Sequence, residues 1–155
     1  MNLRELLRPE LAKANETVKD WEEAIRSAGK LLVADGAVEP RFVDAMIHVA
    51  KEFGPYIVVA PGIALPHARP EDGVIRASMA VVQLATPVNF GNKDNDPVFL
   101  LVALAAIDNQ QHIEGLAELA AVLGNPENVE ALKRCKTEHQ LLDVFYNAGK
   151  TNSNE

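Results

Sequence analysis

The sequence predicts a single α/β domain in which helices flank a mixed central sheet. Apolar residues recur at helical spacing near both ends of the chain, whereas the middle holds short runs rich in β-branched residues. The 155 residues contain no internal repeat and no linker long enough to divide them. These observations indicate one domain over residues 1–147, followed by a small, polar and flexible tail over residues 148–155.

Two amphipathic helices are expected ahead of the first β-rich run. The first has Thr17 as its expected N-cap and stops at Asp35-Gly36. Its apolar residues follow the spacing of one helical face: Val18, Trp21, Ile25, Ala28 and Leu32. The second helix begins near Pro40, which a first turn tolerates, and ends at Gly54-Pro55.

Four β-rich runs are expected to form the sheet. Two short runs, Ile57 to Ala60 and Ile63 to Pro66, lie on either side of the turn at Pro61-Gly62. Two longer runs, Ala77 to Leu84 and Val98 to Ile107, have the continuous apolar character of buried strands. Because a buried helix gives the same signal, the helical alternative stays open for the longer runs.

Three more helices are expected after the last strand. Asp108 is the expected cap of the first, Asn125-Pro126 starts the second, and Thr137 with Gln140 forms a capping box for the third. The first of these helices is expected to bury a stripe made of Ile113, Leu116, Ala120 and Leu123.

The composition restricts the class of partner and the compartment. The formal net charge of -7 argues against nucleic acid or an anionic membrane as the main partner and suits a basic protein instead. The single cysteine, Cys135, cannot form an internal disulfide and is compatible with a reducing cytosol. The longest apolar run, Val98 to Ile107, is too short to span a bilayer. We therefore expect a cytoplasmic protein without direct membrane insertion.

His67 is the foremost candidate for chemistry. It follows a β-like run, and Pro66 fixes the backbone beside it, so its side chain stands at a strand end where a partner can reach it. The guanidinium of Arg69, two residues on, disfavours an imidazolium and offers forked donors to phosphate oxygens. The spacing alone leaves an ordinary loop histidine near a loop arginine equally open.

His112 is a second candidate because it lies in the first turn of the helix that Asp108 is expected to cap. A helix N-terminus attracts anions, so a histidine there is suited to donate to a phosphoryl oxygen, although a solvated first-turn histidine is equally compatible. His48 and His139 are interpreted as ordinary helix histidines. The sequence has no glycine-rich phosphate loop and no metal-ligand spacing, so neither a bound cofactor nor a metal is expected.

The stretch Gly62 to His67 resembles the Gly-Ile-Ala-apolar-Pro-His signature of the enzyme IIA family of the mannitol and fructose class (type 2) in bacterial sugar phosphotransferase systems. His112 matches a second feature of that family, a histidine that opens a helix after a buried strand. The resemblance covers roughly Thr17 to Tyr146. It implies the fold of that family, a mixed sheet flanked by helices.

Four segments resemble the L-ascorbate branch of this family more than its other branches: Glu52 to Tyr56, Ala60 to Gly62, Pro66 to Glu71, and Asp94 to Pro97. Mannitol-type relatives carry an arginine in the second helix that supports the phosphorylated site, and this chain has none at the matching place. Lys51 is the nearest cation, and we expect Arg69 to take over the role.

The resemblance implies a phosphotransferase component with a phosphohistidine intermediate. His67 would accept a phosphoryl group from phospho-HPr and pass it to the cysteine of an enzyme IIB, which serves the membrane component enzyme IIC, here for L-ascorbate uptake. His112 would hold the phosphoryl oxygens and Arg69 would offset their charge. Two alternatives stay open: a regulatory, nitrogen-type enzyme IIA homologue that acts as a phosphorylation-dependent binding module, and a small metallohydrolase that uses both histidines.

Overall fold

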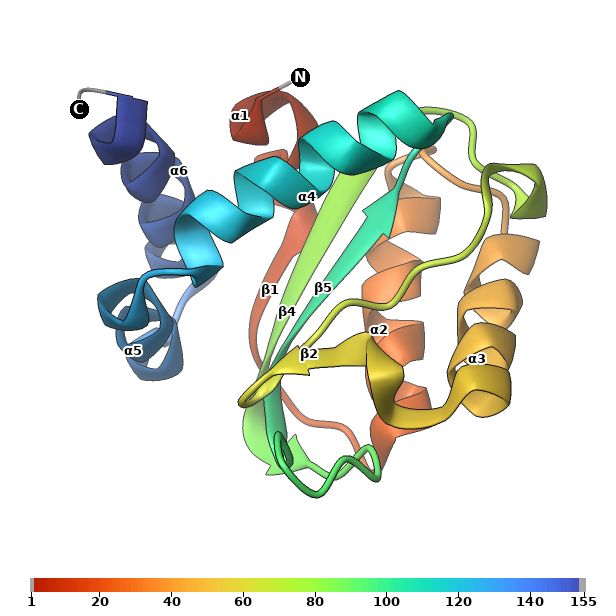
Figure 1. Ribbon diagram of the computed structural model, residues 1–155, viewed down its shortest axis with the longest axis horizontal. Helices are drawn as coiled ribbons and strands as arrows, with labels where there is room; N and C mark the ends of the chain where they lie inside the picture. Colours follow the sequence, from red (N-terminus) through yellow and green to blue (C-terminus); the bar gives the residue numbers. More distant parts are fainter. Residues whose placement is uncertain (1, 154–155) are drawn as a thin grey trace.

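A five-stranded mixed sheet forms the centre of the computed structural model, which describes residues 2–153 and the side chains up to Ala148 (Figure 1). The strand order is β1-β4-β5-β3-β2. β4 and β5 pair antiparallel, β1 is parallel to β4, β3 is parallel to β5, and β2 is antiparallel to β3. The strands are β1 (Ala12–Glu16), β2 (Val58–Ala60), β3 (Ile63–Ala64), β4 (Ser78–Val88) and β5 (Val98–Ala105). The predicted α/β class with a mixed sheet is therefore confirmed.

Helices cover both sides of this sheet. In Figure 1, α2 and α3 lie to the right of the strands, α5 and α6 lie to the left, and α4 passes across the upper end. The helices are α1 (Leu3–Leu6), α2 (Trp21–Ala34), α3 (Arg41–Phe53), α4 (Asn109–Leu123), α5 (Pro126–Arg134) and α6 (Glu138–Ser153). None of the helices in the described part of the chain is both long enough and apolar enough to cross a membrane.

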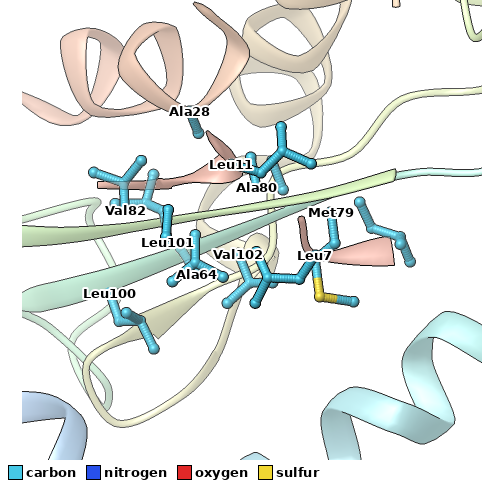
Figure 2. Close-up of a cluster of buried hydrophobic side chains, with 14 of the residues drawn as sticks. Leu7, Leu11, Ala28, Ala64, Met79, Ala80, Val82, Leu100, Leu101 and Val102 are labelled. Carbon is cyan, nitrogen blue, oxygen red and sulfur yellow. The ribbon is translucent and has the colours of Figure 1, made fainter. Parts of the chain in front are cut away.

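The central strands are buried on both faces, which explains their continuous apolar runs. Every residue of β5 is buried, and so are the first seven residues of β4, from Ser78 to Leu84. Figure 2 shows Val82, Leu101 and Val102 packed along these strands, with Ala28 directed at them from α2. The strand interpretation of both long runs, for which the helical alternative was open, is therefore confirmed.

Two glycines set how closely the helices approach their neighbours. A Cβ atom at Gly29 of α2 would lie 2.6 Å from Cγ2 of Val43, so glycine permits the tight contact between α2 and α3. A Cβ atom at Gly115 of α4 would lie 3.0 Å from Cδ1 of Leu104, so α4 packs directly on β5. These two contacts help to fix the positions of α3, which carries His48, and of α4, which carries His112.

The predicted buried stripe of α4 is wrong in its register. The residues of α4 that are buried are Gly115, Leu119 and Val122, whereas Ile113 is 65% exposed and Leu116 is 37% exposed. Ala120 is exposed as well. The physical reason is that α4 is apolar on most sides, so periodicity does not select a face; the glycine side packs inward because only it allows close approach to β5.

Other boundaries differ from the predictions for local reasons. Asp20, not Thr17, caps α2, because its carboxylate accepts from the backbone N–H of Glu23 at 2.9 Å. β1 was not predicted, since it is a short edge strand in which exposed polar residues alternate with alanines.

The capping box of Thr137 and Gln140 is confirmed by reciprocal bonds of 3.2 Å.

The C-terminal helix extends beyond the expected domain end. α6 continues to Ser153, and Ala148 is buried against the core, so helical structure enters the segment that was expected to be a flexible tail. The last two residues of that segment, 154 and 155, lie outside the described part of the chain. A functional boundary at residue 147 stays a prediction.

Candidate functional site

His67 lies directly after β3 and continues its course along β5. The backbone N–H of Leu104 donates to the carbonyl of Pro66 at 3.2 Å, and His67 forms an isolated parallel bridge with Leu104. The side chain of His67 is exposed, and its Nδ1 lies 2.9 Å from the carbonyl oxygen of Leu65. Because a carbonyl oxygen only accepts, Nδ1 is the donor, and in the neutral imidazole the lone pair then lies on Nε2. The local fold thus orients an exposed imidazole with Nε2 as the nucleophilic atom.

His112 lies in the opening turns of α4, whose N-terminus is held by two hydrogen bonds that both involve Gln111. The carboxylate of Asp108 accepts from the backbone N–H of Gln111 at 2.9 Å, and the side-chain oxygen of Gln111 accepts from the N–H of Ile107 at 3.0 Å. The close packing of Gly115 on β5 holds this turn beside the strand that borders His67. His112 therefore occupies a rigid position at a helix N-terminus.

The two histidine rings lie near each other without stacking. Their centroids are 6.4 Å apart, and the ring planes are inclined at 54°. Partial burial lowers the pKa of His112 below its ordinary value of 6.5, and the nearby charge of His67 lowers it further. A neutral His112 at pH 7 keeps one N–H as a donor and adds no charge next to the nucleophile.

A surface cavity of about 750 Å³ surrounds both histidines. One wall is formed by the start of α4, another by the loop after β3, and a third by α3, which are grouped at the right of Figure 1. Arg69 lines the same cavity. The α3 wall consists of residues on one face of the helix, namely Ala45, His48, Val49, Glu52 and Phe53. The three predicted site residues therefore border one cavity.

Arg69 is placed at this cavity but is paired with acids of its own loop. Its Nε lies 3.4 Å from a carboxylate oxygen of Glu71 and 3.9 Å from one of Asp72, and its side chain is 76% exposed. The backbone N–H of Arg69 also donates to Asp72 at 2.9 Å, which caps a short 3₁₀ turn, Pro70–Asp72. The structure thus brings His67 and His112 together and leaves the guanidinium of Arg69 engaged with carboxylates.

His48 is a member of the cavity wall that the sequence interpretation passed over. Its Nε2 lies 3.2 Å from a carboxylate oxygen of Glu52, one turn further along α3. Lys51, the cation nearest to the expected arginine position, is instead 3.3 Å from Glu22 of α2. The missed signal was the spacing itself, because His48 and Glu52 share a helical face with Ala45 and Val49 while Lys51 does not.

The lowered pKa of His112 has a consequence for stability. The unfolded chain binds a proton at this residue near pH 6.5 and the folded chain does so only at lower pH, so stability decreases as the pH falls through 6.5. We expect His112→Gln to reduce this decrease, as measured by urea unfolding between about pH 5 and about pH 8. At about pH 8 neither state of the parent protonates His112, so the offset there reports packing alone. Parallel curves for the two proteins would contradict the assignment.

Comparisons with known proteins match most of the chain. The family model described as "Phosphoenolpyruvate-dependent sugar phosphotransferase system, EIIA 2" matches residues 5–148. The ascorbate-specific PTS system EIIA component of Escherichia coli (strain K12) is 41% identical over 126 residues, which cover 81% of this chain and 82% of that protein.

Two solved structures have the same fold. The solution structure of the mannitol-specific cryptic phosphotransferase enzyme IIA CmtB from Escherichia coli has a TM-score of 0.87 at 32% identity, covering 95% of this chain and 99% of that one. The enzyme IIAMTL structure in complex with phosphorylated enzyme IIBMTL, also from Escherichia coli, has a TM-score of 0.80 at 28% identity, covering 92% and 99%. The predicted resemblance is therefore confirmed at the level of both sequence and fold.

Proposed function

Because the chain belongs to the EIIA 2 family of the phosphoenolpyruvate-dependent sugar phosphotransferase system, we propose that it carries a phosphoryl group on His67. The donor is phospho-HPr and the acceptor is the cysteine of an enzyme IIB. The observation that carries this proposal is the bond between Nδ1 of His67 and the carbonyl of Leu65, because in the neutral imidazole it places the lone pair on Nε2, on an exposed ring beside an open cavity. An unprotonated ring nitrogen is what a nucleophilic histidine requires.

The transfer consists of two in-line substitutions at phosphorus. In the first, the lone pair of Nε2 forms a P–N bond while the P–N bond of the donor breaks and its electron pair returns to the donor imidazole. In the second, a thiolate of enzyme IIB forms a P–S bond while the P–N bond to His67 breaks and Nε2 regains its lone pair. Neither step changes an oxidation state, so positioning and charge stabilisation are the whole task of the protein.

His112 is suited to the second part of this task. It borders the same cavity, lies with its ring centroid 6.4 Å from that of His67, and is biased toward the neutral form by burial. A neutral ring keeps one N–H, which can donate a hydrogen bond to a phosphoryl oxygen. The fixed helix start at Asp108 keeps this donor in place without reorganisation during the reaction.

The sugar served is proposed from the relatives and from the loop beside His67. The relative at 41% identity is an ascorbate-specific component, and it extends over 81% of this chain. We propose that this chain acts in an ascorbate system, in the cytoplasm, and supplies enzyme IIC only indirectly through enzyme IIB. Arg69, which borders His67 and is exposed, lies where an approaching acceptor would meet it.

Arg69→Ala is expected to lower transfer to an ascorbate-type acceptor by about three- to tenfold, since an exposed charge contributes modestly to docking and to charge neutralisation. The measurement compares transfer from the phosphorylated chain to purified ascorbate-type and mannitol-type enzyme IIB. Arg26→Ala is the matched control, because Arg26 is an exposed arginine paired with Asp44 at 3.4 Å and does not line the cavity.

The parent chain is expected to favour the ascorbate-type acceptor in this comparison. Equal rates to both acceptors would contradict the specificity proposal, and an unaffected Arg69→Ala variant would remove Arg69 from the docking surface. Transfer to neither acceptor, with normal labelling of His67, would instead support the regulatory alternative.

A further inference from the structure

The α3 wall of the cavity carries a histidine–glutamate pair that the transfer mechanism above does not use. His48 and Glu52 both line the cavity that contains His67 and His112, and Nε2 of His48 contacts the Glu52 carboxylate at 3.2 Å. The contact uses Nε2 of His48, which leaves Nδ1 as the nitrogen that an anion in the cavity can engage. The side chain of His48 is 76% exposed, so it does not contribute to core packing.

Phosphorylation places a new negative charge in this cavity, and the other cations near it are otherwise engaged. Arg69 is paired with Glu71 and Asp72, and Lys51 is turned toward Glu22 of α2. His112 is biased toward its neutral form. Among the described residues, the other ionisable groups that line the cavity with His48 are Glu52 on its own helix, Tyr56 just after that helix, His67, Arg69 and Asp72 from the loop after β3, and Asp108 and His112 from the start of α4.

We propose that His48 stabilises the phosphorylated state from α3 and thereby sets how readily the chain gives the phosphoryl group up. This rests on the proposed function of His67. In the unmodified protein the Glu52 carboxylate contacts Nε2 of His48 in the cavity wall. Once His67 is phosphorylated, the cavity holds two anions, Glu52 and the phosphoryl group, and the ring nitrogens of His48 can donate to both.

The experiment measures the equilibrium of phosphoryl exchange between the full chain and HPr by intact mass spectrometry. His48→Gln is expected to shift this equilibrium toward phospho-HPr by about three- to tenfold, as expected for one charge acting across a partly solvated cavity. His48→Lys should restore it, because lysine returns the positive charge on the same helix position. The shift should shrink between about 0.02 M and about 0.5 M salt, since screening weakens exposed interactions.

The chain offers a matched control for this pair. His139 and Asp143 on α6 form the same kind of contact, one turn apart and at 3.3 Å, and neither residue lines the cavity. His139→Gln should leave the exchange equilibrium unchanged. A second measurement needs no variant: phosphorylation of the parent chain should move the imidazole NMR signals of His48 and leave those of His139 in place.

The outcomes separate this inference from the proposed function. If the parent chain takes up no phosphoryl group, the function proposed for His67 fails. If the parent is phosphorylated but His48→Gln reaches the same equilibrium, or His48→Lys behaves as His48→Gln does, the role of His48 is overturned. Unmoved NMR signals of His48 on phosphorylation would overturn it as well, whatever the variants do.

Discussion

Replacing His67 with alanine is expected to abolish phosphorylation of this chain while leaving its fold intact. The loss is complete rather than partial because, among the described histidines that line the cavity, only His67 is shown with Nδ1 bonded to a backbone carbonyl, so that its neutral ring has the lone pair on Nε2. The fold should persist because the side chain of His67 is exposed and its bond to the carbonyl of Leu65 contributes about 1 kcal/mol.

The His67→Ala measurement is intact mass after incubation with phosphoenolpyruvate, enzyme I and HPr, together with a urea unfolding curve. His139→Ala is the control, since it removes an exposed histidine far along the chain from the cavity residues and should be labelled as the parent is. An alanine variant at position 67 that still gains one phosphoryl mass would end the account. A variant that fails to unfold cooperatively would have to be replaced by His67→Gln, which keeps a polar side chain at the same site.

His112→Ala is expected to slow transfer to enzyme IIB by about 10² to 10³ while labelling by phospho-HPr falls less, since a preorganised donor acts most strongly where charge moves in the transition state. The donor is preorganised because Asp108 and Gln111 fix the start of α4 and Gly115 holds that helix on β5. Rapid-quench kinetics of the phosphorylated variant with enzyme IIB provide the measurement.

His112→Gln separates hydrogen bonding from packing at this position. Its side-chain amide restores a donor without restoring a titratable ring, so transfer should recover in part and lose the pH dependence that the ring contributes. Transfer kinetics of His112→Ala that match the parent would remove His112 from the mechanism and leave its lowered pKa as a property of the fold alone.

The parts of the fold that the sequence predicted are those with strong local signals. The helix from Arg41 to Phe53 ends at Gly54, whose φ of 70° is costly for other residues, so the end of this helix could be predicted from the glycine. β4 and β5 could be predicted because strands that are buried on both faces have continuous apolar sequences. The buried face of α4 could not be predicted, because it depends on the close contact between Gly115 and Leu104, which is a tertiary contact.

The site shows the same division between local and tertiary information. His67 stood out because Pro66 and the preceding apolar run are its sequence neighbours, and His112 stood out because Asp108 signals a helix start. His48 lies nineteen positions before His67 in the chain, and only the packing of α3 against α2, through Gly29 and Val43, brings its face to the cavity. The partners of Arg69 are likewise a matter of side-chain geometry that spacing did not determine.

Site mapping on the parent protein shows directly whether His67 carries the phosphoryl group. The chain is incubated with phosphoenolpyruvate, enzyme I and HPr, digested at neutral to alkaline pH, and sequenced by mass spectrometry. We expect a single phosphoryl group on the peptide that contains Pro66-His67-Ala68. This group should be lost in acid, because the P–N bond of a phosphohistidine is acid-labile. Phosphate on Cys135, on His112 or on a hydroxyl side chain, or no phosphate at all, would contradict it.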